Sequence, residues 1–124
     1  MGQRMKQAVV LVVEDEPLLR MAALDMVEEA GFTAITASDA DEAVRILKSR
    51  PDITIVFTDI DMPGAMDGLQ LAACIRDRWP PIKIIVVSGF KTPDISEVPA
   101  EAVFFSKPYS DRAIADAMRR MATN

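Results

Sequence analysis

The sequence contains no histidine and only one cysteine, Cys74. Zinc and haem sites usually depend on histidine nitrogens or several thiolates, so sites of that kind are excluded, and no disulfide can form within the chain. Any metal bound here must be a hard cation with oxygen ligands. Cys74 itself is expected to be an apolar filler in a helix rather than a redox centre.

Long apolar runs and an excess of positive charge are also missing. The first apolar run, from Ala8 to Val13, is too short to cross a bilayer, and acidic residues follow it at once, so neither a signal peptide nor a membrane helix is indicated. The chain has 14 basic and 19 acidic residues and a formal net charge of -5. Surfaces for nucleic acid or anionic lipid need clustered Lys and Arg. We therefore expect a cytoplasmic protein that binds neither directly.

The composition that remains is that of an ordinary globular domain. With 124 residues, 50% of them hydrophobic and 27% charged, the chain can bury a core of its own. No internal repeat or low-complexity tract interrupts it. We expect a flexible lead-in at residues 1–6 and a single domain over residues 7–124.

Short apolar runs alternate with amphipathic segments along the chain. The expected strands are residues 9–13, 33–37, 53–58, 82–87 and 102–105, and the expected helices lie at about 17–30, 40–50, 69–79 and 110–121. Ser38 is the predicted N-cap of the second helix and Asp67 that of the third. Strands that alternate with helices predict an α/β fold with a parallel sheet and helices on both faces.

Polar residues follow the ends of four of these strands. They are Glu14 and Asp15, then Asp59, Ser88 and Lys107. The carboxyl ends of parallel strands meet at one edge, so we expect these side chains to share a crevice. Crowded carboxylates need a cation, and a set of oxygen ligands favours Mg²⁺. A carboxylate held at the end of a buried strand can act as a nucleophile toward phosphorus, with the lysine and the serine hydroxyl contacting phosphoryl oxygens.

The motifs at these strand ends resemble the receiver domain of two-component response regulators, of the single-domain or hybrid-kinase type. They are the pair Glu14-Asp15, the segment Thr58-Asp59-Ile60-Asp61-Met62-Pro63, the pair Ser88-Gly89 and the pair Lys107-Pro108. The resemblance covers nearly the whole chain. It implies a flavodoxin-like, doubly wound sheet of five parallel strands in the order 2-1-3-4-5.

The resemblance also implies a role for each residue of the phosphorylation site. Asp59 would accept a phosphoryl group from a histidine kinase or a histidine phosphotransfer protein. Mg²⁺ would be held by Glu14, Asp15, Asp59 and the backbone carbonyl of Asp61. Lys107 would bind the phosphoryl group, and the Lys107-Pro108 peptide would be cis.

Two further positions would convert phosphorylation into a change of surface. Ser88 and Phe104 match the hydroxyl and aromatic switch positions of the family: the aspartyl phosphate would pull the hydroxyl inward, and the ring would pack into the space that it leaves. The sequence ends at Asn124, and we expect no DNA-binding or catalytic effector after the domain. We expect the signal to pass to a downstream protein or onward by phosphotransfer, unless the chain is a piece of a longer regulator or hybrid kinase.

The sequence departs from the family pattern in two places. The loop from Met62 to Gly68 is one residue longer than usual, and residues 90–102 are a few residues shorter and include Pro93 and Pro99. Proline breaks helix interiors and disfavours helix in the residue before it. We therefore expect the fourth helix of the family to be short or irregular here, with no more than a turn around residues 94–97.

Two other functions fit part of the pattern. A small Mg²⁺-dependent phosphatase could use Asp59 as nucleophile and Asp61 as acid. Haloacid-dehalogenase-like enzymes of this kind place their further metal-binding acids after the lysine. In this chain the acidic pair at Glu14 comes before the nucleophile instead. Flavin mononucleotide binding would need a phosphate loop after the first strand, where this chain has Glu14, Asp15 and Glu16, which repel phosphate.

Overall fold

The fold is a five-stranded parallel sheet in the order β2-β1-β3-β4-β5, as the sequence predicts. The computed structural model describes residues 8–64, 66–89, 98–99 and 101–123, and within them the sheet is accompanied by four helices. The strands are β1 (Val9–Val13), β2 (Thr33–Ala37), β3 (Ile53–Asp59), β4 (Lys83–Ser88) and β5 (Val103–Ser106). The helices are α1 (Pro17–Glu29), α2 (Ala40–Ser49), α3 (Gly68–Arg78) and α4 (Asp111–Ala122).

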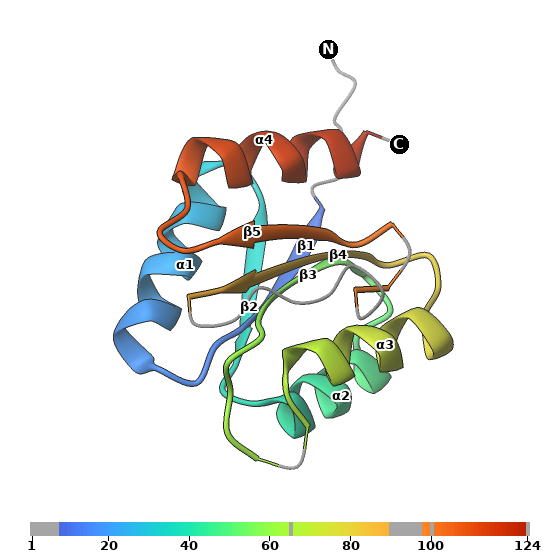
Figure 1. Cartoon of the computed structure of the whole chain (residues 1–124). Coiled ribbons are helices and arrows are strands. Elements are labelled where there is room, and N and C mark those ends of the chain that lie inside the picture. The colour runs from blue at the N-terminus through green and yellow to red at the C-terminus, as the bar shows by residue number, and fades with distance from the viewer. Residues whose placement is uncertain (1–7, 65, 90–97, 100, 124) are drawn as a thin grey trace.

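Helices cover both faces of the sheet. Figure 1 shows α1 and α4 on one face and α2 and α3 on the other. Successive side chains of a strand point to opposite faces, and β1 divides in this way: Val10 and Val12 join the core under α1 and α4, whereas Leu11 and Val13 join the core under α2 and α3. The continuous apolar sequence of β1, with four valines and one leucine, therefore matches a central strand that is buried on both sides.

Three strands end one residue later than the sequence predicts. β3 includes Asp59, which pairs in register with Val87 of β4, and β4 includes Ser88, which pairs with Ser106 of β5. The polar residues at these ends therefore belong to the strand ladder. Their backbone positions are set by the sheet rather than by the following loops.

The predicted N-cap of α2 was wrong by one residue. Asp39, not Ser38, caps the helix, because its extended backbone lets its carboxylate accept the Glu42 N–H at 2.8 Å. The Ser38 hydroxyl instead donates to Glu42 Oε1 at 2.9 Å. The predicted cap of α3 is confirmed: Asp67 and Gln70 form a reciprocal capping box.

The buried stripe of α1 is narrower than its apolar sequence suggests. The helix buries Ala23, Met26 and Val27, but Ala22 is exposed and Leu19 is 48% exposed. Leu19 lies near the start of the helix, where it lines a surface hollow next to Lys107 instead of packing on the sheet. Leu19 and Ala22 thus have the helical spacing of core residues but do not belong to the core.

Some expectations fall outside the part of the chain that the structure describes. These are the lead-in at residues 1–6 and the turn at residues 94–97 that would replace a long helix. Among the described residues, no helix combines the length and the apolar character that a membrane crossing would need.

Gly68, the first residue of α3, is required by a close approach between backbones. A Cβ at this position would lie 2.0 Å from the carbonyl oxygen of Asp59 and 2.7 Å from Cα of Ile60. The Gly68 N–H also donates to the Ile60 carbonyl at 3.2 Å. The start of α3 is thus packed directly on the end of the strand that carries Asp59.

We predict that Gly68→Ala lowers the free energy of unfolding by about 2–4 kcal/mol, because backbone atoms must move to admit the methyl group. Gly31→Ala is the matched control: it adds a methyl group with nothing within 4 Å and costs only the strain of its positive φ of 100°, about 1–2 kcal/mol. Urea unfolding measures both variants. Equal losses would contradict the steric explanation.

Candidate functional site

Three carboxylates gather at the carboxyl end of the sheet. Glu14 and Asp15 directly follow β1, and Asp59 ends the neighbouring strand β3. Each contributes an oxygen atom, and these oxygens all lie within 4.8 Å of one another. Glu14 and Asp59 are only 7% and 4% exposed, so the charges are concentrated in a largely desolvated place.

The turn that carries the two acids after β1 is held from both sides. The Glu14 N–H donates to the Ala37 carbonyl at 3.1 Å, which continues the pairing with β2. Arg20, one turn into α1, donates from Nη1 to the backbone carbonyls of Glu14 at 3.0 Å and Asp15 at 3.4 Å. Sequence reasoning missed Arg20. The available signal was a basic residue that follows Glu14 by six positions and Asp15 by five, near the start of a helix.

Lys107 supplies the opposing charge. Its Nζ lies 2.6 Å from Asp59 Oδ2 and 3.9 Å from Glu14 Oε1. Its backbone N–H donates to the Ser88 carbonyl at 2.9 Å, which ties the segment after β5 to β4. The Lys107-Pro108 peptide is cis, as the family resemblance implied.

The electrostatics of the site show too much negative charge for one lysine. Burial is the main cause that raises the pKa of Glu14, to about 7, and contact with Asp59 raises it further, against the lowering effects of the Glu16 N–H and Lys107. Burial opposes the charge of Lys107, but its pKa is raised because the hydrogen bond and charge of Asp59, with the charges of Glu14 and Asp61, outweigh that penalty. Protons and cations are both attracted to such a cluster.

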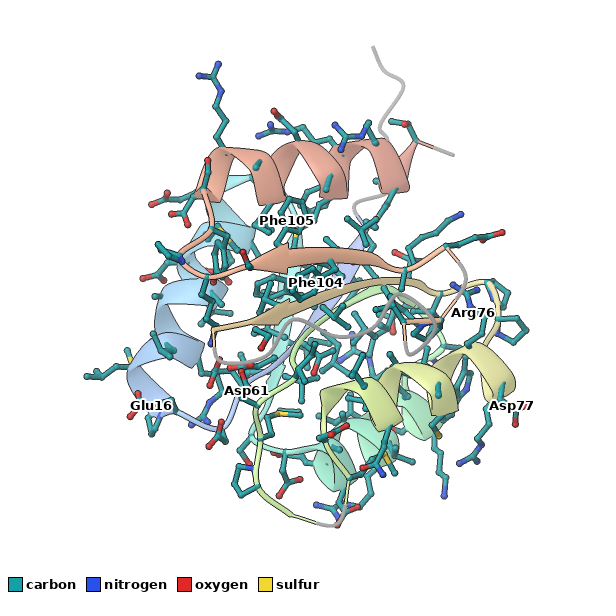
Figure 2. The ribbon with its side chains drawn as sticks, in the orientation of Figure 1. Glu16, Asp61, Arg76, Asp77, Phe104 and Phe105 are labelled. Carbon is teal, nitrogen blue, oxygen red and sulfur yellow. The ribbon has the colours of Figure 1, made fainter. Side chains whose placement is uncertain are left out.

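Asp61 connects the acidic cluster to the end of β4. Its backbone N–H donates to Asp59 Oδ1 at 2.9 Å. Its carboxylate oxygen Oδ2 accepts from the Ser88 hydroxyl at 2.8 Å and from the Gly89 N–H at 3.2 Å. From the sequence, Asp61 was expected to supply a backbone carbonyl to the metal or, in the alternative phosphatase, an acid; its side-chain contacts with Ser88 and Gly89 were not foreseen. Figure 2 shows Asp61 at the end of the sheet, between the strands and the following loops.

Phe104 lies apart from these polar contacts, within the body of the domain. It is partly buried and packs against the core under α2 and α3, whereas Phe105 packs against the core under α1 and α4 (Figure 2). The two rings therefore belong to opposite faces of β5. Ser88, one strand away on β4, is 1% exposed.

A hollow of about 420 Å³ opens next to Lys107. Its lining residues are Glu14, Leu19, Gly89, Lys107, Pro108 and Tyr109. Tyr109 is fixed by an edge-to-face contact with Phe57, with 5.8 Å between ring centroids. Leu18 and Met21 on the same end of α1 are 76% and 61% exposed. The hollow thus combines the charged Glu14 and Lys107 with the apolar side chain of Leu19, a combination that the sequence did not reveal.

The residues fit a hard divalent cation. All the candidate ligands are carboxylate or carbonyl oxygens, which Mg²⁺ prefers, and one ammonium balances only one of the three clustered carboxylates. A cation would also lower the raised pKa of Glu14, because a nearby positive charge favours the charged carboxylate. Glu14, Asp15, Asp59 and the carbonyl of Asp61 are the residues that would hold it.

We predict that the metal-free protein becomes less stable as the pH rises from about 5 to 7. The pKa of Glu14 is about 7 in the folded protein against 4.5 for a free side chain. Between these two values the native state binds more protons than the unfolded state, so the free energy of unfolding decreases as the pH rises. We expect Glu14→Gln to remove about 1–3 kcal/mol of this loss. Urea unfolding in EDTA measures it, with Glu28→Gln, an exposed residue of α1, as control. A slope unchanged by Glu14→Gln would contradict the assignment.

Comparison with known proteins places the chain among signalling domains. It is 35% identical over 118 residues to the sensor kinase CckA of Brucella abortus, covering 92% of this chain and 12% of that protein. It is 30% identical over 116 residues to the response regulator receiver protein CpdR of the same organism, covering 90% of this chain and 94% of CpdR. Two further regulatory relatives are also much longer, and the chain spans 24% of each.

Structure and family comparison agree with this. The crystal structure of a response regulator receiver protein from Sinorhizobium medicae matches with a TM-score of 0.88 and 25% identity, covering 95% of this chain and 96% of that one. The response regulator receiver domain family matches residues 10–119. The chain therefore belongs to the receiver domain family of two-component response regulators, whose members are phosphoryl-accepting signalling domains.

Proposed function

We propose that this chain is a switch in which Asp59 accepts a phosphoryl group from a phosphohistidine in the presence of Mg²⁺. The observation that carries the proposal is the position of Asp59. It is 4% exposed and 2.6 Å from a lysine ammonium, and it lies within an oxygen-rich cluster suited to a divalent cation. A carboxylate in such a place has an oxygen for nucleophilic attack and neighbours that can balance the incoming charge.

In the proposed reaction an Asp59 oxygen forms a bond to phosphorus while the phosphorus–nitrogen bond of phosphohistidine breaks. The imidazole leaves as a neutral ring after it takes up a proton. Lys107, already in contact with Asp59, balances charge on a phosphoryl oxygen. When bound, Mg²⁺ would reduce the repulsion between the carboxylates and the phosphoryl oxygens. The Asp61 N–H, which donates to Asp59 Oδ1, fixes the orientation of the acceptor carboxylate.

The switch in our proposal runs through Ser88 and Phe104. The Ser88 hydroxyl and the Gly89 N–H lie at the end of β4, next to the strand that carries Asp59, and can donate to a phosphoryl oxygen. Phe104 on β5 is only partly buried, so its ring is less constrained than that of a fully buried residue. Its movement would change the surface that a downstream protein recognises.

The proposed donor is a histidine kinase or a histidine phosphotransfer protein. The relative CckA is named a sensor kinase, and other relatives are named response regulators, which supports a partner of this kind. In this proposal the chain catalyses only its own phosphorylation and dephosphorylation. The alternative phosphatase would need the Asp61 side chain to donate a proton to a leaving group, but its Oδ2 is engaged by the Ser88 hydroxyl and the Gly89 N–H. The geometry therefore favours the switch.

We predict one phosphoryl adduct per chain after incubation with Mg²⁺ and a small phosphodonor such as acetyl phosphate. Intact mass should show the adduct, and it should be stable in acid and labile in base, as expected for an acyl phosphate. Asp59→Asn should abolish it. Asp67→Asn, which removes a charge from the same segment but keeps a good N-cap, should retain it. An adduct that persists in Asp59→Asn would disprove the acceptor assignment.

We predict that Mg²⁺ raises the melting temperature and that Asp15→Asn weakens this effect. Loss of one of the carboxylate ligands should raise the dissociation constant for Mg²⁺ at least about tenfold, or about 1.4 kcal/mol. Asp77→Asn is the matched control, since this exposed residue lies near the end of α3 away from Gly68 and the site (Figure 2). Titration followed by thermal unfolding gives both constants. Equal weakening in the two variants would indicate only a general effect of charge.

A further inference from the structure

One carboxylate oxygen of Asp61 collects two hydrogen-bond donors from the end of β4. Asp61 Oδ2 accepts from the Ser88 hydroxyl at 2.8 Å and from the Gly89 N–H at 3.2 Å. The other side of the same residue is fixed as well, because its N–H donates to Asp59 Oδ1 at 2.9 Å. Asp61 thus bridges the acceptor carboxylate and the predicted switch hydroxyl.

The two donors are the ones that a phosphoryl group on Asp59 would use. A hydroxyl has a single proton to donate, and the backbone N–H has one. An anionic oxygen that holds both donors reproduces the contacts of an anionic phosphoryl oxygen. Ser88 is 1% exposed, so its hydroxyl has little contact with water.

We propose that the Asp61 carboxylate is a built-in stand-in for the phosphoryl group. It occupies the Ser88 and Gly89 donors in the unphosphorylated protein and must leave them before the aspartyl phosphate can bind there. The inference deepens the proposed function and rests on it. Asp61 is a positioning residue in this scheme: it holds Ser88 turned toward the crevice and does not react.

Two effects follow from this competition. Phosphorylation replaces one anion with another at the Ser88 and Gly89 donors. The free energy gained there is only the difference between the two sets of hydrogen bonds. The displaced carboxylate must also move away from a new group of the same charge. Both effects weaken the binding of a phosphoryl group relative to a chain with an uncharged residue at this position.

The test uses beryllium fluoride, which mimics a phosphoryl group on a carboxylate and binds at equilibrium. With Mg²⁺ saturating, Asp61→Ala should bind it at least about tenfold more tightly than the natural chain, the scale of one charge-assisted hydrogen bond. Asp61→Asn keeps the shape and a neutral acceptor, so it should lie between the two. Asp67→Asn removes a charge from the same segment without touching these donors and should leave the affinity unchanged.

A second readout needs neither metal nor phosphoryl group. In the metal-free protein the amide proton of Gly89 should resonate downfield and exchange slowly, and in Asp61→Ala it should lose both properties. A purely structural role for Asp61 would not produce this change together with tighter binding. In the Ser88→Ala background, the affinity gain from Asp61→Ala should be smaller, because one of the two contested donors is already absent.

The outcomes separate the two proposals. If the natural chain forms the acyl phosphate but Asp61→Ala and Asp61→Asn bind beryllium fluoride no more tightly than it does, the stand-in role is overturned and the switch remains. An unchanged Gly89 amide in Asp61→Ala would also overturn it. If the natural chain forms no phosphoryl adduct and binds no beryllium fluoride, the proposed function fails, and this inference fails with it.

Discussion

The contact between Lys107 and Asp59 is the interaction on which the rest of the site depends. A 4% exposed carboxylate is costly unless a cation is near it, and here the ammonium lies 2.6 Å away. The same lysine is 3.9 Å from Glu14, but its single charge cannot balance both neighbours. The pKa of Glu14 is raised to about 7, chiefly by burial and further by Asp59, so the charged form of this carboxylate is not fully stabilised by the lysine. The site is therefore built to take up more positive charge, by proton or by metal.

The sheet makes this arrangement possible because it fixes the backbones that carry the charges. Asp59 and Ser88 are the last residues of paired strands, and the start of α3 is packed against Asp59 through Gly68 with no space for a side chain. Arg20 and the Ala37 carbonyl hold the turn after β1. Repulsion between the acids cannot be relieved by moving these backbones without breaking the ladder. Stability of the fold thus maintains a locally unfavourable arrangement of charge, as is common at functional sites.

The sequence predicted the strands and the meeting of the charged residues from hydrophobic patterns, and the family resemblance supplied the strand order. An apolar run such as Val9–Val13, with four valines, suits a buried strand, and polar residues at strand ends must share an edge once the sheet is parallel. It failed where the outcome depends on one or two atoms. Ser38 and Asp39 are both good caps, and only the backbone conformation decides between them. Leu19 has the spacing of a core residue but lies where the helix has passed the sheet.

The side chain of Asp61 is the most consequential feature that sequence could not supply, since its rotamer decides whether it faces the cation site or β4. In the proposed switch, its contact with Ser88 and Gly89 would change the free energy gained on phosphorylation. Moving a two-state equilibrium from mostly off to mostly on takes about 5.5 kcal/mol of differential interaction. If an anion already holds those two donors, they contribute only a fraction of their full strength on phosphorylation. In the proposed switch, the larger share would then come from Lys107, from a cation among the carboxylates and from the repacking of Phe104.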